Sequence, residues 1–208
     1  MWTYEKKLQY PVRIKTPNAR TAKYIISQLG GPDGELAASL RYMHQRYTAK
    51  PDKVKGVLTD IATEELAHVE MISAILYQLT DGLTPEQIKE AGFDAYFVDH
   101  TLGLYPQSAA GVPFTAAYFQ SKGDPITDLT EDMAAEQKAR STYDNILRVV
   151  RDIPEIADPI RFLRSREIVH FQRFGEALRS VQENLDAKNF YAFNPAFDNP
   201  CKASCKNS

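Results

Sequence analysis

Residues 54–79, VKGVLTDIATEELAHVEMISAILYQL, decide the fold of this chain. Their apolar side chains recur at steps of three and four residues, which is the repeat of a single helical face. Glu65 and His68 take two of those steps, so a carboxylate and an imidazole share the face that should be buried. Pro51 suits the first turn of a helix, and the pattern predicts one long helix over 51–79.

A second stretch repeats this arrangement near the end of the chain. The apolar steps from Ile156 to Val181 again include a glutamate and a histidine, Glu167 and His170, each 102 residues after its counterpart. The period predicts a helix over 154–185, with proline tolerated in its opening turns.

Two further helices each offer one inward carboxylate. The steps within 32–47 place Glu35 on the apolar face, and those within 124–151 place Glu136 there. A shorter helix is expected over 18–29, and strand signals are nearly absent.

The connections between these helices indicate the topology. The segment 80–123 is too long for a hairpin turn and predicts a crossover, whereas the other two connections are short. One long and two short connections are typical of an all-α, ferritin-like four-helix bundle. We expect one bundle domain over 1–185 and a short C-terminal tail over 186–208.

Charge and hydropathy exclude several classes of partner. The net charge of −2 supplies no basic surface for nucleic acid or an anionic membrane. No apolar run approaches the roughly 18 residues that a membrane-spanning helix needs. Glu5, Lys6 and Lys7 fall where a secretory signal would have its apolar segment, so we expect a chain made in the cytoplasm without a signal peptide.

The two cysteines, Cys201 and Cys205, both lie in the tail. The fold therefore rests neither on a disulfide framework nor on a four-cysteine zinc site. These residues could cross-link to neighbouring proteins or remain free thiols. The aromatic tail residues Phe190, Tyr191, Phe193 and Phe197 could dock onto partners.

Four glutamates facing one core require neutralisation, because a buried carboxylate is costly unless it is paired, protonated or bound to a metal. Two divalent cations would balance four ionised carboxylates, and two neutral imidazoles would add no charge. Oxygen and nitrogen donors without thiolate suit manganese or iron. The expected metal ligands are Glu35, Glu65, His68, Glu136, Glu167 and His170.

Other polar residues near these motifs receive weaker interpretations. Tyr42 could fill the core or donate a hydrogen bond to a carboxylate, and Arg140 could be a buried counter-charge or lie at the bundle edge. His44 and His100 are expected to be surface or otherwise satisfied histidines. Acidic residues off the apolar faces are expected to be solvated, namely Glu64, Glu70, Glu131 and Asp132.

Several strings resemble the manganese catalase family, and in particular its short spore-coat branch. They cover nearly the whole chain: MWTYEKKLQYPV at 1–12, GELAASLRYMHQRY at 34–47, TDIATEELAHVEM at 59–71, AAGVPFTAAY at 109–118 and SREIVHFQRF at 165–174. The resemblance implies a dimanganese core that disproportionates hydrogen peroxide to water and oxygen, in a protein placed in the coat of a bacterial endospore.

The resemblance also implies a role for each residue of the centre. Glu65 would bridge the two ions, His68 and His170 would each give one ion a nitrogen ligand, and Glu35 and Glu136 would be terminal or bridging ligands. Glu167 would move protons as the catalytic acid and base, either beside the metal or as a ligand. Expected partners are hydrogen peroxide, other spore-coat proteins and further copies of the chain, which form hexamers in the family.

Two departures from the family pattern affect these expectations. Larger members carry an arginine just before the third-helix ligand, whereas Ala135 precedes Glu136 here, so we expect a wider or less charged substrate channel. Larger members also have a long C-terminal extension that wraps neighbouring subunits, whereas we expect only the short tail over 186–208 in this chain.

The alternatives to a catalase are a structural coat protein whose dimetal site stabilises the bundle, and a di-iron oxidase of the same fold.

Overall fold

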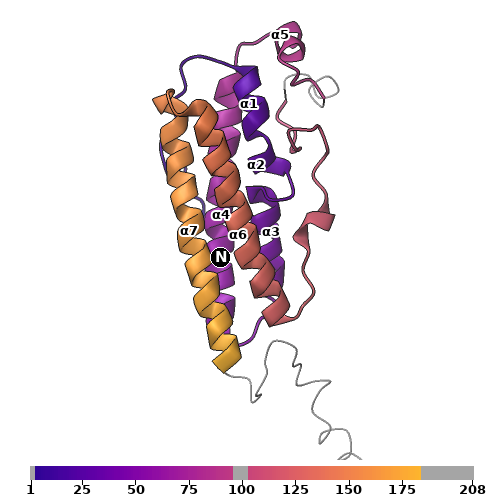
Figure 1. Ribbon diagram of the computed structural model, residues 1–208, viewed down its shortest axis with the longest axis vertical. Coiled ribbons are helices and arrows are strands. Elements are labelled where there is room, and N and C mark those ends of the chain that lie inside the picture. The colour runs from indigo at the N-terminus through magenta and orange to yellow at the C-terminus, as the bar shows by residue number, and fades with distance from the viewer. Residues whose placement is uncertain (1–2, 96–102, 184–208) are drawn as a thin grey trace, which may run out of the picture.

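A computed structural model describes residues 3–95 and 103–183 of the chain, and the described part is helical. Figure 1 shows the long helices side by side, with a long connection running along one side. Within the described residues, extended pairing is confined to one isolated bridge between Gln107 and Pro113. The elements in chain order are α1 (Ala19–Ile25), α2 (Ser27–Gly30), α3 (Glu35–Gln45), α4 (Asp52–Thr80), α5 (Pro85–Glu90), η1 (Ala116–Phe119), α6 (Pro125–Val150) and α7 (Pro154–Glu183).

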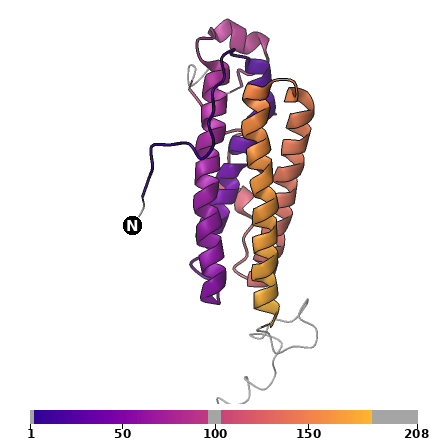
Figure 2. The same ribbon diagram turned by 90° about the vertical axis from the view of Figure 1, so that its left-hand side faces the viewer.

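The arrangement is a ferritin-like helical bundle made of two hairpins. In the first hairpin α3 packs on α4, in the second α6 packs on α7, and α4 contacts α7 across the bundle. The connection from α4 to α6 is the predicted crossover and includes α5 and η1 (Figures 1 and 2). The predicted helices are confirmed to within a few residues, except that the helix expected over 18–29 is divided at Ile26.

Two apolar clusters fill the bundle at different heights. One joins the C-terminal half of α4 to the start of α7, with members such as Ile72 and Ile160. The other joins the N-terminal half of α4 to the end of α7, with members such as Leu58 and Phe174. On α4 and α7 the buried glutamates and histidines fall between these clusters, so the polar layer is enclosed by hydrocarbon above and below.

The crossover is held closely against the first hairpin. A side chain on Gly30 would place its Cβ only 2.2 Å from the backbone nitrogen of Gln107, so a glycine is needed where the two segments touch. Further along, Arg41 of α3 donates to the carbonyl oxygens of Tyr118 and Phe119, each at 2.7 Å. The crossover therefore covers α3 rather than extending freely from the bundle.

The N-terminal arm follows α4, and Figure 2 shows it leaving the bundle beside that helix. Gln9 donates to Glu64 at 2.7 Å, and Gln78 donates to the carbonyl of Val12 at 3.2 Å. None of the described helices is both long and apolar enough to span a bilayer. Several sequence expectations fall outside the described residues, namely those for His100, the tail over 186–208, its aromatic residues, and Cys201 and Cys205.

Candidate metal centre

The bundle brings together all six residues that the sequence proposes as metal ligands. Each is at most 1% exposed. They form two overlapping groups of four, and within each group one ligand atom per residue lies within 4.8 Å of the others. The first group is Glu35, Glu65, His68 and Glu167, and the second is Glu65, Glu136, Glu167 and His170.

Glu65 lies between the two histidines. Its Oε2 is 2.8 Å from Nδ1 of His68, and its Oε1 is 2.6 Å from Nδ1 of His170. The two imidazole rings stack with their centroids 5.6 Å apart. One carboxylate thus presents one oxygen to each histidine, which is the geometry of a bridging ligand.

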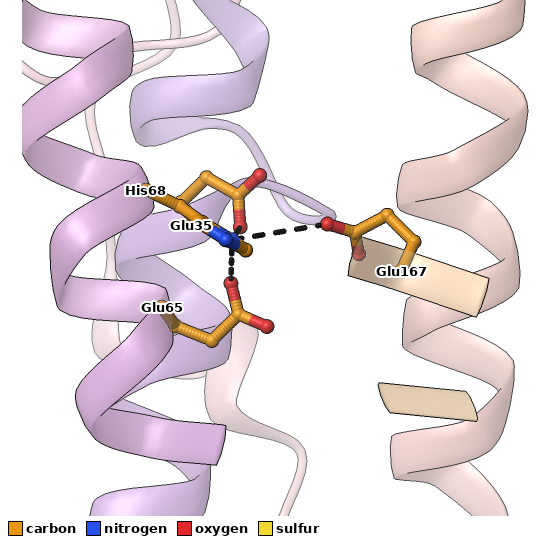
Figure 3. Close-up of side chains that lie close together, drawn as sticks. All are labelled: Glu35, Glu65, His68 and Glu167. Carbon is orange, nitrogen blue, oxygen red and sulfur yellow. Dashed lines mark hydrogen bonds and ion pairs between the residues drawn. The ribbon is translucent and has the colours of Figure 1, made fainter. Parts of the chain in front are cut away.

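The remaining carboxylates divide between the two sides. Oε2 of Glu35 lies 3.7 Å from Nδ1 of His68, and Oε2 of Glu136 lies 3.4 Å from Nδ1 of His170. Glu167 reaches across from α7, with its Oε1 3.9 Å from Nδ1 of His68, as Figure 3 shows. Each side therefore has one histidine, one glutamate of its own, and a share in Glu65 and Glu167.

Two tyrosines hold the outer glutamates from the opposite hairpin. The hydroxyl of Tyr42 on α3 donates to Glu136 on α6, and that of Tyr143 on α6 donates to Glu35 on α3. Tyr42 is thus a donor to a carboxylate as well as a core residue. The matching contact of Tyr143 was missed, although its signal is in the sequence: each tyrosine follows its own hairpin's glutamate by seven residues.

The expectation that Glu64 is a solvated surface residue was wrong. Its Oε2 lies 2.9 Å from Nε2 of His170, and its Oε1 lies 3.9 Å from Nε2 of His68. Arg166 donates to Glu64 at 2.6 Å, and Gln9 donates to the same oxygen at 2.7 Å. Glu64 therefore supports the outer nitrogen of a histidine whose inner nitrogen faces the centre, which fixes the ring orientation.

Asp132 was also wrongly expected to be solvated. It is fully buried, it accepts a hydrogen bond from Gln45 at 2.9 Å, and burial raises its pKa well above the ordinary value. Arg140, by contrast, pairs with Asp144 at 2.6 Å on the partly exposed edge of the bundle. His44 is exposed, with its Nδ1 2.7 Å from the carbonyl of Leu40.

Burial sets the proton affinities in the centre when no cation is present. Desolvation, followed by the charge of Glu65, raises the pKa of Glu35 to about 8. Desolvation and the neighbouring carboxylates raise the pKa of Glu167 well above its ordinary value. Desolvation would also raise the pKa of Glu65, but the charges of His170 and His68 outweigh it and lower that pKa well below the usual range.

The histidines show the reciprocal effect. Burial alone would lower the pKa of each ring, but the charge of Glu65 and hydrogen bonds to carboxylates raise it to about 10 for His68 and to about 12 for His170. In the metal-free protein, protons therefore supply the positive charge that the carboxylates need.

The unpaired atoms of the centre test whether cations would fit in place of these protons. Among the described residues, Oε1 of Glu65 and Nδ1 of His170 have no hydrogen-bond partner, although they lie 2.6 Å apart. Their alignment is unsuitable for a hydrogen bond but is compatible with two donors that share an ion. Oε2 of Glu136 and Oε1 of Glu167 are also buried without partners. The donor set fits two divalent cations, held by oxygen and imidazole nitrogen.

Comparison with known proteins agrees with this geometry. The chain is 57% identical over 191 residues to Protein CotJC of Bacillus subtilis, covering 92% of this chain and 100% of that protein. It is 32% identical to a probable manganese catalase of Clostridium acetobutylicum, covering 91% of this chain and 85% of the relative. The crystal structure of KatB, a manganese catalase from Anabaena, superposes with a TM-score of 0.81 at 31% identity and covers 94% of this chain and 87% of that one.

The model of one protein family, described as Manganese containing catalase, matches residues 1–198 of this sequence. The match includes every residue of the centre and both hairpins that carry it. The resemblance inferred from the motifs is thus confirmed, and the chain belongs to the manganese-containing catalase family.

Proposed function

We propose that this protein is a dimanganese catalase, which converts two molecules of hydrogen peroxide into two of water and one of oxygen. The observation that carries the proposal is the pair of overlapping ligand groups joined through Glu65. Oxygen and nitrogen donors alone suit both manganese and iron. Manganese is proposed because the chain belongs to the manganese-containing catalase family.

The reaction moves two electrons and two protons in each half. One peroxide loses both and becomes oxygen, and the other gains both, breaks its O–O bond and becomes two water molecules. When bound, two manganese ions that each change by one unit of oxidation state supply storage for the two electrons. The side chains of the protein must then store and return the protons.

Glu167 is the residue proposed to move those protons. It is buried, its pKa is raised well above the ordinary value by desolvation and neighbouring carboxylates, and its Oε1 has no hydrogen-bond partner within 3–95 and 103–183. Glu65 has the opposite character, because its low pKa keeps it ionised between the histidines. We assign Glu65 to bridging and Glu167 to acid and base catalysis, whether or not Glu167 also touches an ion.

The residues around the ligands would keep this site in one geometry. The hydroxyls of Tyr42 and Tyr143 orient the outer glutamates, and Glu64 orients His170. The apolar clusters on both sides exclude water, which strengthens every charge interaction within the layer.

The proposal includes a location and partners. The resemblance of the motifs to the spore-coat branch of the family and the 57% identity to Protein CotJC support a place in the coat of a bacterial endospore. There the chain would contact other coat proteins and further copies of itself, and it would remove hydrogen peroxide. A hexamer is the assembly that the family resemblance implies.

The test compares two matched glutamate variants of the full chain loaded with manganese. Glu167→Gln should keep its metal and lose oxygen evolution by about 100-fold or more, because it can no longer exchange a proton. Glu65→Gln should lose both the metal and the activity, because the bridge becomes a neutral amide. Oxygen release is followed with an electrode, and metal content by elemental analysis.

Two results would contradict the proposal. If the wild-type protein, fully loaded with manganese, releases no oxygen from peroxide, the centre has a structural role. If protein isolated from its native source contains iron rather than manganese, the oxidase alternative replaces the catalase.

A further inference from the structure

The N-terminal arm, residues 3–17, is attached to both hairpins of the bundle. On α4 the backbone amide of Ile14 donates to the side-chain oxygen of Gln78 at 2.7 Å. On α7 the ring of Phe162 stacks with that of Tyr10, with the centroids 5.1 Å apart. The arm therefore crosses from one hairpin to the other at the place where α4 meets α7.

A groove open to solvent lies between the arm, α4 and α7. Its volume is about 720 Å³, and Glu64 and Arg166 form part of its wall. Behind them lies His170, whose side chain is 0% exposed and whose Nε2 is 2.9 Å from Oε2 of Glu64. The side chain of Glu64 is 16% exposed, so it separates solvent from the outer nitrogen of a proposed ligand. On this side the centre lies one side chain away from water.

Two donors from different elements hold this carboxylate in place. Arg166 of α7 donates to Oε1 of Glu64 at 2.6 Å, and Gln9 of the arm donates to the same oxygen at 2.7 Å. The second oxygen of Glu64 faces His170. Two hydrogen bonds in series therefore join Gln9, an exposed residue of the arm, to an imidazole of the metal centre.

The two donors differ in how firmly they are fixed. Arg166 is 29% exposed and also reaches Oε2 of Glu64 at 3.2 Å, so this pair could turn toward the groove as a unit. Gln9 opposes that movement, because both of its chain neighbours pack against the apolar core. If Glu64 turned away, His170 would lose the partner that fixes its ring. A ligand that leaves its position more often should release its ion more often.

We propose that Gln9 is a positioning residue for the metal centre, and that through it the N-terminal arm slows the loss of manganese. Gln9 touches neither an ion nor the substrate, because it acts through Glu64 on His170. This role rests on the metal centre of the proposed function and is independent of turnover. It connects the centre to a segment that supplies none of the six proposed ligands.

The test measures how fast the full-length, manganese-loaded protein loses its metal to excess EDTA. Gln9→Met keeps the length of the side chain and removes the donor. It should release manganese about three- to tenfold faster, since a hydrogen bond to a charged group is lost. Samples are desalted at intervals and their manganese is measured by elemental analysis. Because Gln9 is exposed, the variant should fold and melt as the wild type does. An unchanged release rate would overturn the proposal.

Tyr4→Phe is the matched control. Tyr4 is an exposed residue of the same arm, and it donates to Glu70 of the same helix rather than to Glu64. Its variant should lose manganese at the wild-type rate. If Tyr4→Phe speeds the loss as much as Gln9→Met does, the arm acts through its general attachment, and the role assigned to Gln9 is wrong.

Two further variants test whether Gln9 acts through its hydrogen bond to Glu64. Gln9→Lys restores a donor and should return release toward the wild-type rate, although an added positive charge would by itself favour loss of a cation. In a Glu64→Ala background, Gln9→Met should have no further effect, because the carboxylate through which Gln9 acts is gone. An undiminished effect in that background would contradict the proposal.

Oxygen evolution separates this inference from the proposed function. A wild-type protein that holds manganese, loses it faster as Gln9→Met and evolves no oxygen would refute the catalase and keep the role of Gln9. An active catalase whose metal loss is the same in the wild type and Gln9→Met would do the reverse. A wild type that takes up no manganese would overturn both.

Discussion

The two hairpins of the bundle carry the same proposed ligands but have different surroundings. Each supplies a glutamate, a tyrosine seven residues later, and a Glu-x-x-His motif on its second helix. Each tyrosine donates to the glutamate of the other hairpin, so this part of the centre has approximate twofold symmetry. The residue before each Glu-x-x-His motif departs from this symmetry. It is Glu64 in the first hairpin and Arg166 in the second, and the two form an ion pair.

This difference separates the two sides of the centre. His170 has a carboxylate at 2.9 Å from its outer nitrogen, whereas the outer nitrogen of His68 lies 3.9 Å from the same group and has no hydrogen bond to any residue that the structure describes. The two motif glutamates also differ, because the pKa of Glu65 is lowered and that of Glu167 is raised. A repeated sequence supplies the proposed ligand set, and unequal neighbours shift the pKa values of its two motif glutamates in opposite directions.

The largest expected effect is a loss of stability in the metal-free protein as the pH rises, which tests whether protons replace the ions on both sides. The pKa of Glu35 rises from 4.5 to about 8 on folding, and that of His68 rises from 6.5 to about 10. In both cases the folded state holds a proton that the unfolded state has released. The stabilisation from His68 is complete below pH 6.5 and is lost as the pH rises through 10.

The free energy of unfolding should therefore fall by about 1.4 kcal/mol per pH unit for each excess proton held by the folded state. Thermal unfolding of chelator-treated protein at several pH values between 6 and 10 measures this fall. Manganese-loaded protein is the control and should lack it, because cations occupy the place of the protons. A melting temperature of the metal-free protein that stays level or rises over this range would contradict the predicted proton occupancy.

The second effect concerns the asymmetric support of His170. Glu64→Gln should lower manganese affinity by about 10- to 100-fold, since residues that orient a ligating histidine typically contribute that much. Competition against a chelator measures the affinity. Glu70→Gln is the matched control, because Glu70 lies on the same helix and accepts a hydrogen bond from Tyr4 at the surface. Equal affinities for the Glu64 and Glu70 variants would remove Glu64 from the centre.

The smallest expected effect is a loss of stability on removal of either core tyrosine hydroxyl, and it should be equal in the two hairpins. Tyr42→Phe and Tyr143→Phe each leave a buried carboxylate without its donor and should cost about 1–3 kcal/mol in the free energy of unfolding. Urea denaturation of the metal-free proteins measures the loss. Tyr77→Phe is the control, because Tyr77 is 59% exposed and should change stability little. A loss in only one of the two core variants would show that the symmetry does not extend to energetics.

The helices and the burial of the proposed ligands could be predicted because both depend on position along one helix. The apolar period marks which side of each helix is buried, and Glu65 lies within that period, so its burial follows from the sequence alone. Glu64 is the adjacent residue and falls outside the period. Its contacts come from Arg166 and His170 on another helix, and no pattern within α4 contains that information.

The same limit explains the other residues that were missed. Arg41 appears in the sequence as an ordinary charged residue of an amphipathic helix, because its burial depends on how the crossover lies over α3. Asp132 is buried, and it accepts its hydrogen bond from Gln45 of another helix. Tyr143 differs, since its spacing from Glu136 repeats that of Tyr42 from Glu35 and could have predicted its contact.

The pairing of Glu64 with Arg166 has a consequence for any simpler ancestor or redesign of this bundle. A homodimer of the first hairpin would place two glutamates face to face beside the histidines, and a homodimer of the second would oppose two arginines. Like charges in such proximity repel, so a homodimer of either hairpin would require a substitution at this position. A single polypeptide that contains two unequal hairpins avoids this repulsion, because one hairpin can carry the glutamate and the other the arginine.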